Sequence, residues 1–182
     1  GIRDHCVTGV QTCALPIYWE NKPYVMNENH GPRRGIEAYH GRSWIPILSD
    51  TDITIHDVHF ASHTFHEIQM YYPMRAIRDH DWKLIWNIAH PLPYPFASDL
   101  WVASSWQAQY RQSLNAPYGM KTVEEYIYRP RFELYHIAED PEETMNLADD
   151  PNQATVLLRY KEKLKSMQRK FSDPWITKWN YE

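Results

Sequence analysis

The densest group of histidines in the sequence lies in a short run that ends in the segment H-T-F-H-E. The run contains His56, His59, His63 and His66, and Glu67 follows directly. Neutral imidazoles and a carboxylate suit Zn²⁺, so a metal site is one interpretation. The spacing is not the helical H-E-x-x-H motif, and part of the run alternates like a strand, which would divide the side chains between two faces. The pattern favours buried or hydrogen-bonded histidines, or a pocket edge made by His66 and Glu67, and we assign no metal ligand.

No other set of residues has the spacing of a catalytic centre. The sequence contains no glycine-rich phosphate loop, no G-x-S-x-G motif and no helical zinc motif. The carboxylate pairs Glu142–Glu143 and Asp149–Asp150 are neighbours in sequence, and helix capping explains them better than a glycosidase pair does. We therefore predict no catalytic residue in this chain.

Aromatic side chains are the remaining candidates for ligand binding, since the chain has 8 Trp and 13 Tyr. Trp101, Trp106 and Tyr110 could stack on a sugar ring, although core packing is the more common use of such a group. The basic residues of the last helix, from Arg159 to Lys170, fit a solvated outer face better than a membrane-binding one.

Residues 1–17 are unlike the rest of the chain. Their sequence, G-I-R-D-H-C-V-T-G-V-Q-T-C-A-L-P-I, can be back-translated in frame to an indexed adapter used in short-read sequencing. We expect this segment to be a translated artefact and leave it out of the fold prediction. The native N-terminal part would then be missing, and the lack of a signal peptide would say nothing about localisation.

Composition excludes several classes of protein. The formal net charge of −4 gives no general electrostatic reason to bind nucleic acid. No apolar run approaches the roughly 18 residues that a membrane span needs. Both cysteines, Cys6 and Cys13, lie in the discounted segment, so we predict neither a disulfide framework nor a thiolate zinc site. We expect no nucleic-acid partner and no membrane partner.

Alternating apolar residues and breakers predict the elements that carry these side chains. Strands are expected at 53–60, 67–78, 82–88 and 126–137, and helices at 100–114 and 151–171. Pro73 requires an edge or a bulge in the second strand, and Pro130 breaks the fourth.

The last helix has the clearest pattern. Leu157, Tyr160, Leu164, Met167 and Phe171 recur at spacings of three and four and form one apolar stripe. The whole pattern predicts an α+β fold, in which a small antiparallel sheet has a long C-terminal helix packed on it.

The segment 132–151 connects the last predicted strand to this helix. Asp140, Pro141 and Glu143 have the order of a helix start with a capping box, and Asp150–Pro151 repeats the start signal. We expect a strand, a single capped helical turn and then the capped helix.

The same segment, F-E-L-Y-H-I-A-E-D-P-E-E-T-M-N-L-A, resembles the closing motif of sulfatases of the alkaline-phosphatase superfamily. In that family a strand with E-L-Y leads to D-P-x-E-x-x-N-L and a terminal helix. Gly41–Leu48 is similar to the G-x-S-L-x-P-L segment that ends the family's large α/β domain. The segments H-E-I-Q-M-Y-Y-P-M-R, L-P-Y-P-F and Y-R-P-R-F-E-L-Y resemble the N-sulfatase branch more specifically.

The resemblance implies a division of the chain and a function for the whole protein. Residues 18–52 would end the N-terminal catalytic α/β domain, and residues 53–182 would form the C-terminal subdomain. The family hydrolyses sulfate groups, and the N-sulfatase branch removes the N-linked sulfate of glucosamine in heparan-type glycosaminoglycans. The implied partners are the chain's own catalytic domain and a sulfated sugar, and a homodimer is compatible with the family. Family members are periplasmic, secreted or lysosomal.

The family's chemistry needs a formylglycine, made from Cys or Ser in C/S-x-P-x-R, and a calcium ion held by Asp and Asn side chains. The sequence contains no C/S-x-P-x-R. We therefore expect both groups in the missing N-terminal domain and no cofactor in this fragment, which would be inactive alone. The resemblance carries over only His66 and Glu67, as residues at the rim of the substrate pocket.

Two alternatives remain open. Another hydrolase of the superfamily, an O-sulfatase or a phosphonate-ester hydrolase, would share the closing motif. A free-standing sugar-binding module that uses Trp101, Trp106 and Tyr110 is the non-enzymatic alternative.

Overall fold

The computed structural model describes residues 48, 57–65, 70–95 and 97–181. The chain divides into two units, Gly1–Asp57 and Val58–Glu182, and nearly all described residues belong to the second unit. The predictions of an artefact at 1–17 and of a catalytic-domain end at 18–52 concern residues that are almost all outside the described ranges, and they stay predictions.

The second unit is organised around a four-stranded antiparallel sheet in the order β1-β2-β3-β6. Its strands are β1 (His59–Phe65), β2 (Tyr71–Arg78), β3 (Trp82–Asn87) and β6 (Phe132–His136). The predicted third strand is confirmed, and the second is confirmed from Tyr71 onward, with residues 67–69 outside the described ranges. The Asp79 carboxylate accepts the backbone N–H of Trp82 at 3.0 Å in the short link between them. The first strand lies later than predicted, and residues 53–56 are outside the described ranges.

Pro73 lies in β2, an inner strand of the sheet. The register between β1 and β2 shifts between His63 and Phe65, opposite this proline, and the pairing of β2 with β3 begins only at Met74. The missing N–H of Pro73 therefore interrupts no regular ladder, which confirms the predicted bulge.

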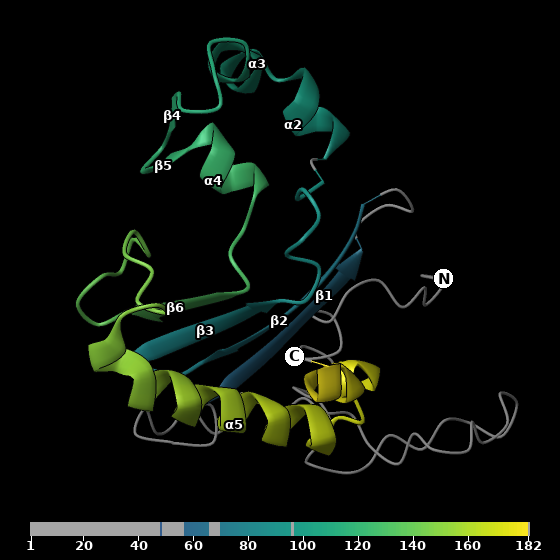
Figure 1. Ribbon diagram of the computed structural model, residues 1–182, viewed down its shortest axis with the longest axis vertical. Coiled ribbons are helices and arrows are strands. Elements are labelled where there is room, and N and C mark those ends of the chain that lie inside the picture. The colour runs from purple at the N-terminus through teal and green to yellow at the C-terminus, as the bar shows by residue number, and fades with distance from the viewer. Residues whose placement is uncertain (1–47, 49–56, 66–69, 96, 182) are drawn as a thin grey trace, which may run out of the picture. The chain divides into compact units, whose positions relative to one another are not determined.

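Helix α5 (Ala154–Lys170) crosses one face of the sheet, as Figure 1 shows. The fully buried side chains of Tyr160 and Leu164 reach Ile77, Leu84 and Trp86 in the core between helix and sheet. The final helix η6 (Pro174–Tyr181) adds Trp179, whose ring stacks on Trp86 with the centroids 4.0 Å apart. The α+β prediction, with the C-terminal helix on one face, is confirmed.

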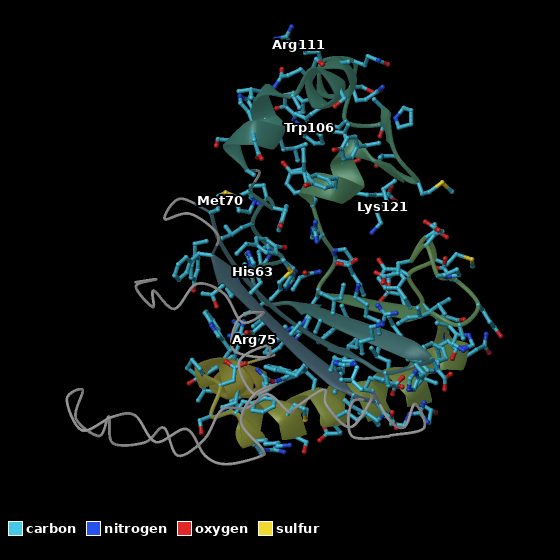
Figure 2. All side chains as sticks on the ribbon, turned by 180° about the vertical axis from the view of Figure 1, so that it is seen from behind. His63, Met70, Arg75, Trp106, Arg111 and Lys121 are labelled. Atoms are coloured by element: carbon cyan, nitrogen blue, oxygen red, sulfur yellow. The ribbon has the colours of Figure 1, made fainter. Side chains whose placement is uncertain are left out.

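An insertion between β3 and β6 has its own small core. It contains α2 (Ser98–Val102), α3 (Ser104–Tyr110), β4 (Pro117–Tyr118), β5 (Lys121–Thr122) and α4 (Val123–Ile127). Trp106 is fully buried at its centre, against Val123 and Ile127 (Figure 2). The single helix predicted at 100–114 is wrong in its bounds, because Ala103 is extended and divides it into two short helices.

The strand predicted from residue 126 is also wrong at its start. Thr122 caps α4, since its hydroxyl accepts the N–H of Glu125 while the Glu125 carboxylate accepts the N–H of Thr122. This capping box starts α4, which continues to Ile127, and the strand begins only at Phe132.

The segment between β6 and α5 differs in part from the prediction. Asp140 does not start a helix. Its carboxylate instead accepts the N–H of Met145 at 2.8 Å and the hydroxyl of Thr144 at 3.0 Å, which closes a turn. Glu143 has a φ of 55° and binds Lys83, so it cannot complete a capping box. The second start signal is confirmed, because Asp150 accepts the N–H of Asn152 at 2.9 Å just before α5.

Candidate functional site

The two faces of the sheet carry different chemistry. Strand alternation directs Leu84, Trp86 and Leu134 toward α5 and directs their neighbours to the opposite face. On that opposite face four large polar side chains are almost completely buried: Tyr72, Asn87, Glu133 and Tyr135. They lie on three adjacent strands, at and near the end of the sheet where β3 ends and β6 begins. A buried cluster of this kind needs partners, and its partners define the site.

Glu133 is the centre of this cluster. Its carboxylate accepts the Asn87 side-chain amide at 2.7 Å and the hydroxyl of Tyr135 at 2.6 Å. The Asn87 amide also donates to the carbonyl of Pro130 at 2.7 Å. Burial and the neighbouring Glu133 carboxylate together raise the pKa of Tyr135, so this hydroxyl remains a donor at physiological pH.

Lys121 connects the insertion to this cluster. Its ammonium group lies 3.6 Å from the Glu133 carboxylate and donates to the Tyr135 hydroxyl at 3.2 Å. Figure 2 shows the side chain directed from the insertion toward the sheet. Because 42% of the Lys121 side chain is exposed, the cluster has one cationic group that reaches solvent.

Arg129 lies beside the same cluster, three residues before β6. Its guanidinium stands 3.9 Å from the ring centroid of Tyr94 and 5.6 Å from that of Tyr126. The Tyr94 ring meets the Tyr72 ring edge-on at 5.1 Å. Burial raises the pKa of Tyr72 to about 12, and its hydroxyl has no hydrogen-bond partner among the described residues. The site thus combines a cation, tyrosine rings and an unused buried hydroxyl.

The histidines that the sequence singled out are only partly described. His56, His66 and Glu67 lie outside the described residues, so the predicted pocket rim stays a prediction. His59 is exposed on β1. The Nδ1 atom of His63 lies 3.0 Å from the carbonyl oxygen of Tyr72, so the hydrogen-bonded interpretation holds for His63. In the part of the chain that the structure describes, no three His, Cys, Asp or Glu side chains come together in a way that could hold a metal.

The aromatic residues proposed for sugar stacking lie together, since the Tyr110 ring is 5.3 Å from the Trp101 ring and 5.9 Å from the Trp106 ring, but they differ in exposure. Trp106 has an exposed fraction of 0% and packs against Tyr118 and Tyr126, so its ring cannot receive a sugar. Trp101 and Tyr110 remain 42% and 37% exposed. The sugar-binding prediction is therefore wrong for Trp106, because this side chain fills the core of the insertion.

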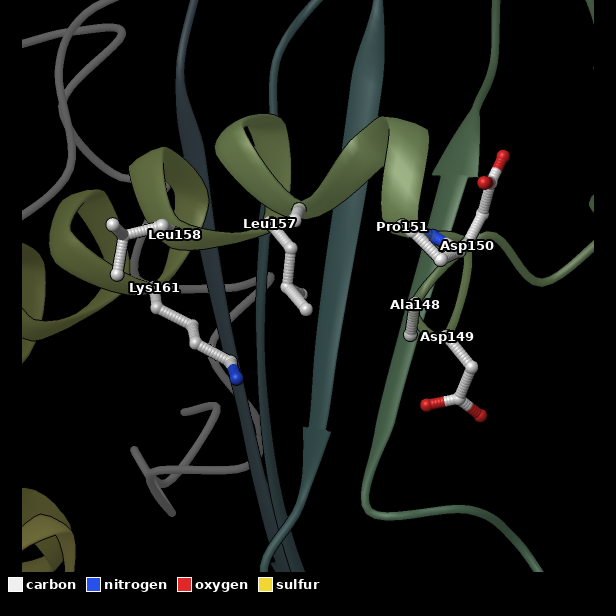
Figure 3. Close-up of a pocket in the computed structure, with 8 residues that line it drawn as sticks. Ala148, Asp149, Asp150, Pro151, Leu157, Leu158 and Lys161 are labelled. Carbon is white, nitrogen blue, oxygen red and sulfur yellow. The ribbon is translucent and has the colours of Figure 1, made fainter.

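A shallow pocket on the α5 side offers less chemistry (Figure 3). It lies where the loop after β6 meets the first turns of α5 and is lined by Ala148, Asp149, Asp150, Pro151, Ala154, Leu157, Leu158 and Lys161. Burial and the nearby Arg131 and Lys165 lower the pKa of Lys161, whose ammonium covers the Phe132 ring at 3.8 Å. Asp150 is occupied as a helix cap. This arrangement has no evident reaction, and the Glu133 cluster remains the better candidate.

Sequence reasoning did not predict the roles of Glu133, Asn87, Lys121 or Arg129. One signal was present, since Glu133 stands between apolar neighbours in a strand that the pattern predicted as only half-buried. Its partners come from segments far away in the sequence, and no local pattern indicates them.

Comparison with known proteins identifies the family to which this chain belongs. No family model matches it. A curated human protein, N-sulphoglucosamine sulphohydrolase, is 35% identical over 140 residues, which is 75% of this chain and 27% of that protein. This chain belongs to the sulfatase family. The chain thus spans about a quarter of the length of that relative, and the predicted correspondence to the C-terminal part of a sulfatase is confirmed.

Solved structures are similar to this chain as well. A 2-O glycosaminoglycan sulfatase and a sulfatase from Bacteroides thetaiotaomicron each give a TM-score of 0.49 at 17% identity, over 85% of this chain and 23% of theirs. A structure in complex with D-glucosamine-2-N,6-O-disulfate gives a TM-score of 0.44 at 16% identity, over 74% of this chain and 20% of that one.

Proposed function

We propose that the protein containing this chain hydrolyses a sulfate group of a glycosaminoglycan, with the N-linked sulfate of glucosamine as its substrate group. The 35% identity to the human N-sulphoglucosamine sulphohydrolase over 140 residues carries this proposal. The resemblance seen in the sequence, through H-E-I-Q-M-Y-Y-P-M-R and Y-R-P-R-F-E-L-Y, supports the same branch of the family.

The proposed role of this chain is to pack on the catalytic domain and to shape the substrate cleft. The face of the sheet opposite α5 supports this role, because half-buried side chains such as Met74, Ala76 and Ile85 lie there beside the buried polar cluster. A face of this composition suits contact with another part of the same protein.

The residues that the structure describes offer no site for the formylglycine or the calcium ion of the family. The sequence has no C/S-x-P-x-R for the formylglycine, and the described residues bring together no acidic group that could hold a cation. We assign both groups to the rest of the protein, and we route no step of the reaction through this chain.

The test is an assay of the complete protein that contains this chain. The rate of hydrolysis of N-sulfoglucosamine is compared with the rates for 6-O-sulfated glucosamine, a 2-O-sulfated uronate and a phosphonate ester. We expect the N-sulfated sugar to be hydrolysed with the highest kcat/KM. A preference for an O-sulfate or for the phosphonate ester would replace the proposal by the alternative within the superfamily.

A further inference from the structure

We propose that Arg129, with the tyrosines around it, binds an anionic group of the sugar, a sulfate or a carboxylate. This inference rests on the proposed function, because it names the part of this chain that would contact a sulfated glycosaminoglycan. The site lies at the junction of the insertion and the end of the sheet where β6 begins.

The first reason for this proposal is that the Arg129 guanidinium is stacked on a tyrosine ring but has no hydrogen-bond or ion-pair partner among the described residues. It lies over the ring of Tyr94 at 3.9 Å and is within 5.6 Å of the Tyr126 centroid. Within the described residues it makes no hydrogen bond and no ion pair. Stacking occupies the face of a guanidinium and leaves its N–H edge available, and that edge matches the two oxygens of a sulfate or carboxylate. Arg129 is only half-buried, so part of this residue reaches solvent.

The backbone around Arg129 is fixed from both sides. The Asn87 side chain binds the carbonyl of Pro130 at 2.7 Å, and its N–H binds the carbonyl of Arg131 at 2.9 Å. The N–H of Tyr94 binds the carbonyl of Ile127 at 2.7 Å. These bonds hold the guanidinium and its tyrosine support in place before any ligand arrives, which lowers the entropic cost of binding.

Glu133 does not neutralise this cation. Its carboxylate is already bound by Asn87 and Tyr135, and Lys121 lies within 3.6 Å of it. The local positive charge of Arg129 is therefore left for an external anion.

The second observation is the hydroxyl of Tyr72. This side chain is fully buried, and its hydroxyl has no hydrogen-bond partner among the described residues. Its ring contacts the Tyr94 ring on which Arg129 lies. Buried hydroxyls rarely remain unpaired, so an unused donor on a ring that packs against the same Tyr94 as the guanidinium indicates a polar ligand. Tyrosine rings at the same place can also pack on the apolar face of a sugar.

The experiment titrates the 182-residue chain with an N-sulfated heparin disaccharide and measures the Kd by calorimetry. Arg129→Gln and Arg129→Lys are compared with Arg159→Gln, which removes another arginine that lies over a tyrosine, 5.2 Å from the Tyr160 centroid on α5. We expect Arg129→Gln to weaken binding by about 10-fold or more, since a hydrogen bond to a charged group is worth about 1.5–3 kcal/mol. Arg129→Lys should lose part of the affinity, and Arg159→Gln should lose none.

Disaccharides that lack either the sulfate or the carboxylate identify which anion is bound, because removal of that group should abolish the difference between the wild type and Arg129→Gln. The proposal is wrong if the wild-type chain binds no disaccharide, or if Arg129→Gln binds as tightly as the wild type. If Arg129→Gln leaves sugar affinity unchanged and lowers the Tm of the complete protein, Arg129 contacts the catalytic domain instead. Sulfate release by the complete protein is a separate measurement, so the two proposals fail independently.

Discussion

Arg75 carries a buried positive charge on the α5 face of the sheet. Its guanidinium binds the Asp173 carboxylate through two bonds, Nε–Oδ2 at 2.5 Å and Nη2–Oδ1 at 3.0 Å. The two residues are only 4% and 7% exposed. Gln168 donates to the same carboxylate at 3.1 Å and in turn accepts the Trp179 indole N–H at 2.7 Å. The pair therefore joins β2 to the end of α5 and to η6.

Asp173→Asn tests how much this pair matters. The change leaves the Arg75 charge buried without a counter-ion, and loss of one partner of a buried pair costs about 3–5 kcal/mol. Urea denaturation should show that decrease in the free energy of unfolding. Asp149→Asn is the matched control, because Asp149 is exposed, and it should change stability by less than about 0.5 kcal/mol. Equal stability of the two variants would contradict the buried ion pair.

The Asp79 carboxyl leads to a prediction about how the stability of the protein changes at acidic pH. Burial of this carboxyl would raise its pKa, but hydrogen bonds from Lys163, Tyr160 and the Trp82 backbone outweigh burial and lower the pKa from 3.8 to about 2. A carboxyl whose pKa is lower in the folded state contributes stability above the unfolded pKa, and this contribution is lost as pH falls through the folded value. The wild type should therefore lose more stability than Asp79→Asn between pH 4 and pH 2.

Thermal unfolding of both proteins from pH 6 to pH 2 measures this difference. Asp173 also has a lowered pKa and contributes to the acid dependence of both proteins, so the comparison isolates Asp79. Parallel curves for the wild type and Asp79→Asn would show that the bonds to Tyr160 and Lys163 do not stabilise the folded state.

At the scale of elements, α5 and the sheet form one core, and the amphipathic pattern of α5 determines which of its residues matter. Leu164 is fully buried against the sheet, whereas Leu158 on the same helix is 62% exposed. The insertion is a second element with its own core around Trp106. The core between α5 and the sheet can be tested with a single substitution.

Leu164→Ala should destabilise the protein by about 2–5 kcal/mol, because it removes buried methyl groups and leaves a cavity. Leu158→Ala is the matched control on the same helix. It should change the free energy of unfolding by less than about 0.5 kcal/mol, since alanine is also a good helix former. Chemical denaturation checks both variants, and similar losses would mean that α5 presents a different face to the sheet.

At the scale of the whole molecule, the chain spans 27% of the human relative's length, so its proposed work depends on the part of the protein outside this sequence. Within the described residues no helix is long and apolar enough to cross a membrane. Arg129 is the group proposed here to bind an anionic group of the sugar, and it supplies no nucleophile.

The 182-residue chain alone should therefore release no sulfate from N-sulfoglucosamine. The complete protein, assayed in parallel, is the positive control. If the isolated chain is inactive because it is misfolded, its circular dichroism spectrum will lack the signal of a folded protein. Sugar binding by the isolated chain is measured separately. Sulfate release by the purified chain would show that a catalytic group lies within these residues.

The sequence determined the elements whose signals are local. Strands β2 and β3 and helix α5 follow from alternation, a three-four apolar repeat and the Asp150–Pro151 start, all of which lie within a few residues. The closing motif was enough to indicate the family. The false helix start at Asp140 shows the limit of such signals, because a capping residue can close a turn as well as begin a helix.

The tertiary structure alone decided the candidate site and the buried charges. Glu133 binds Asn87 across 46 residues of sequence, and Arg75 binds Asp173 across 98. The burial of a polar side chain depends on the partners that folding brings to it, and those partners have no fixed sequence spacing. For the same reason only the fold could show that Trp106 is a core residue and that Arg129 lies over the Tyr94 ring with no hydrogen bond to any other described residue.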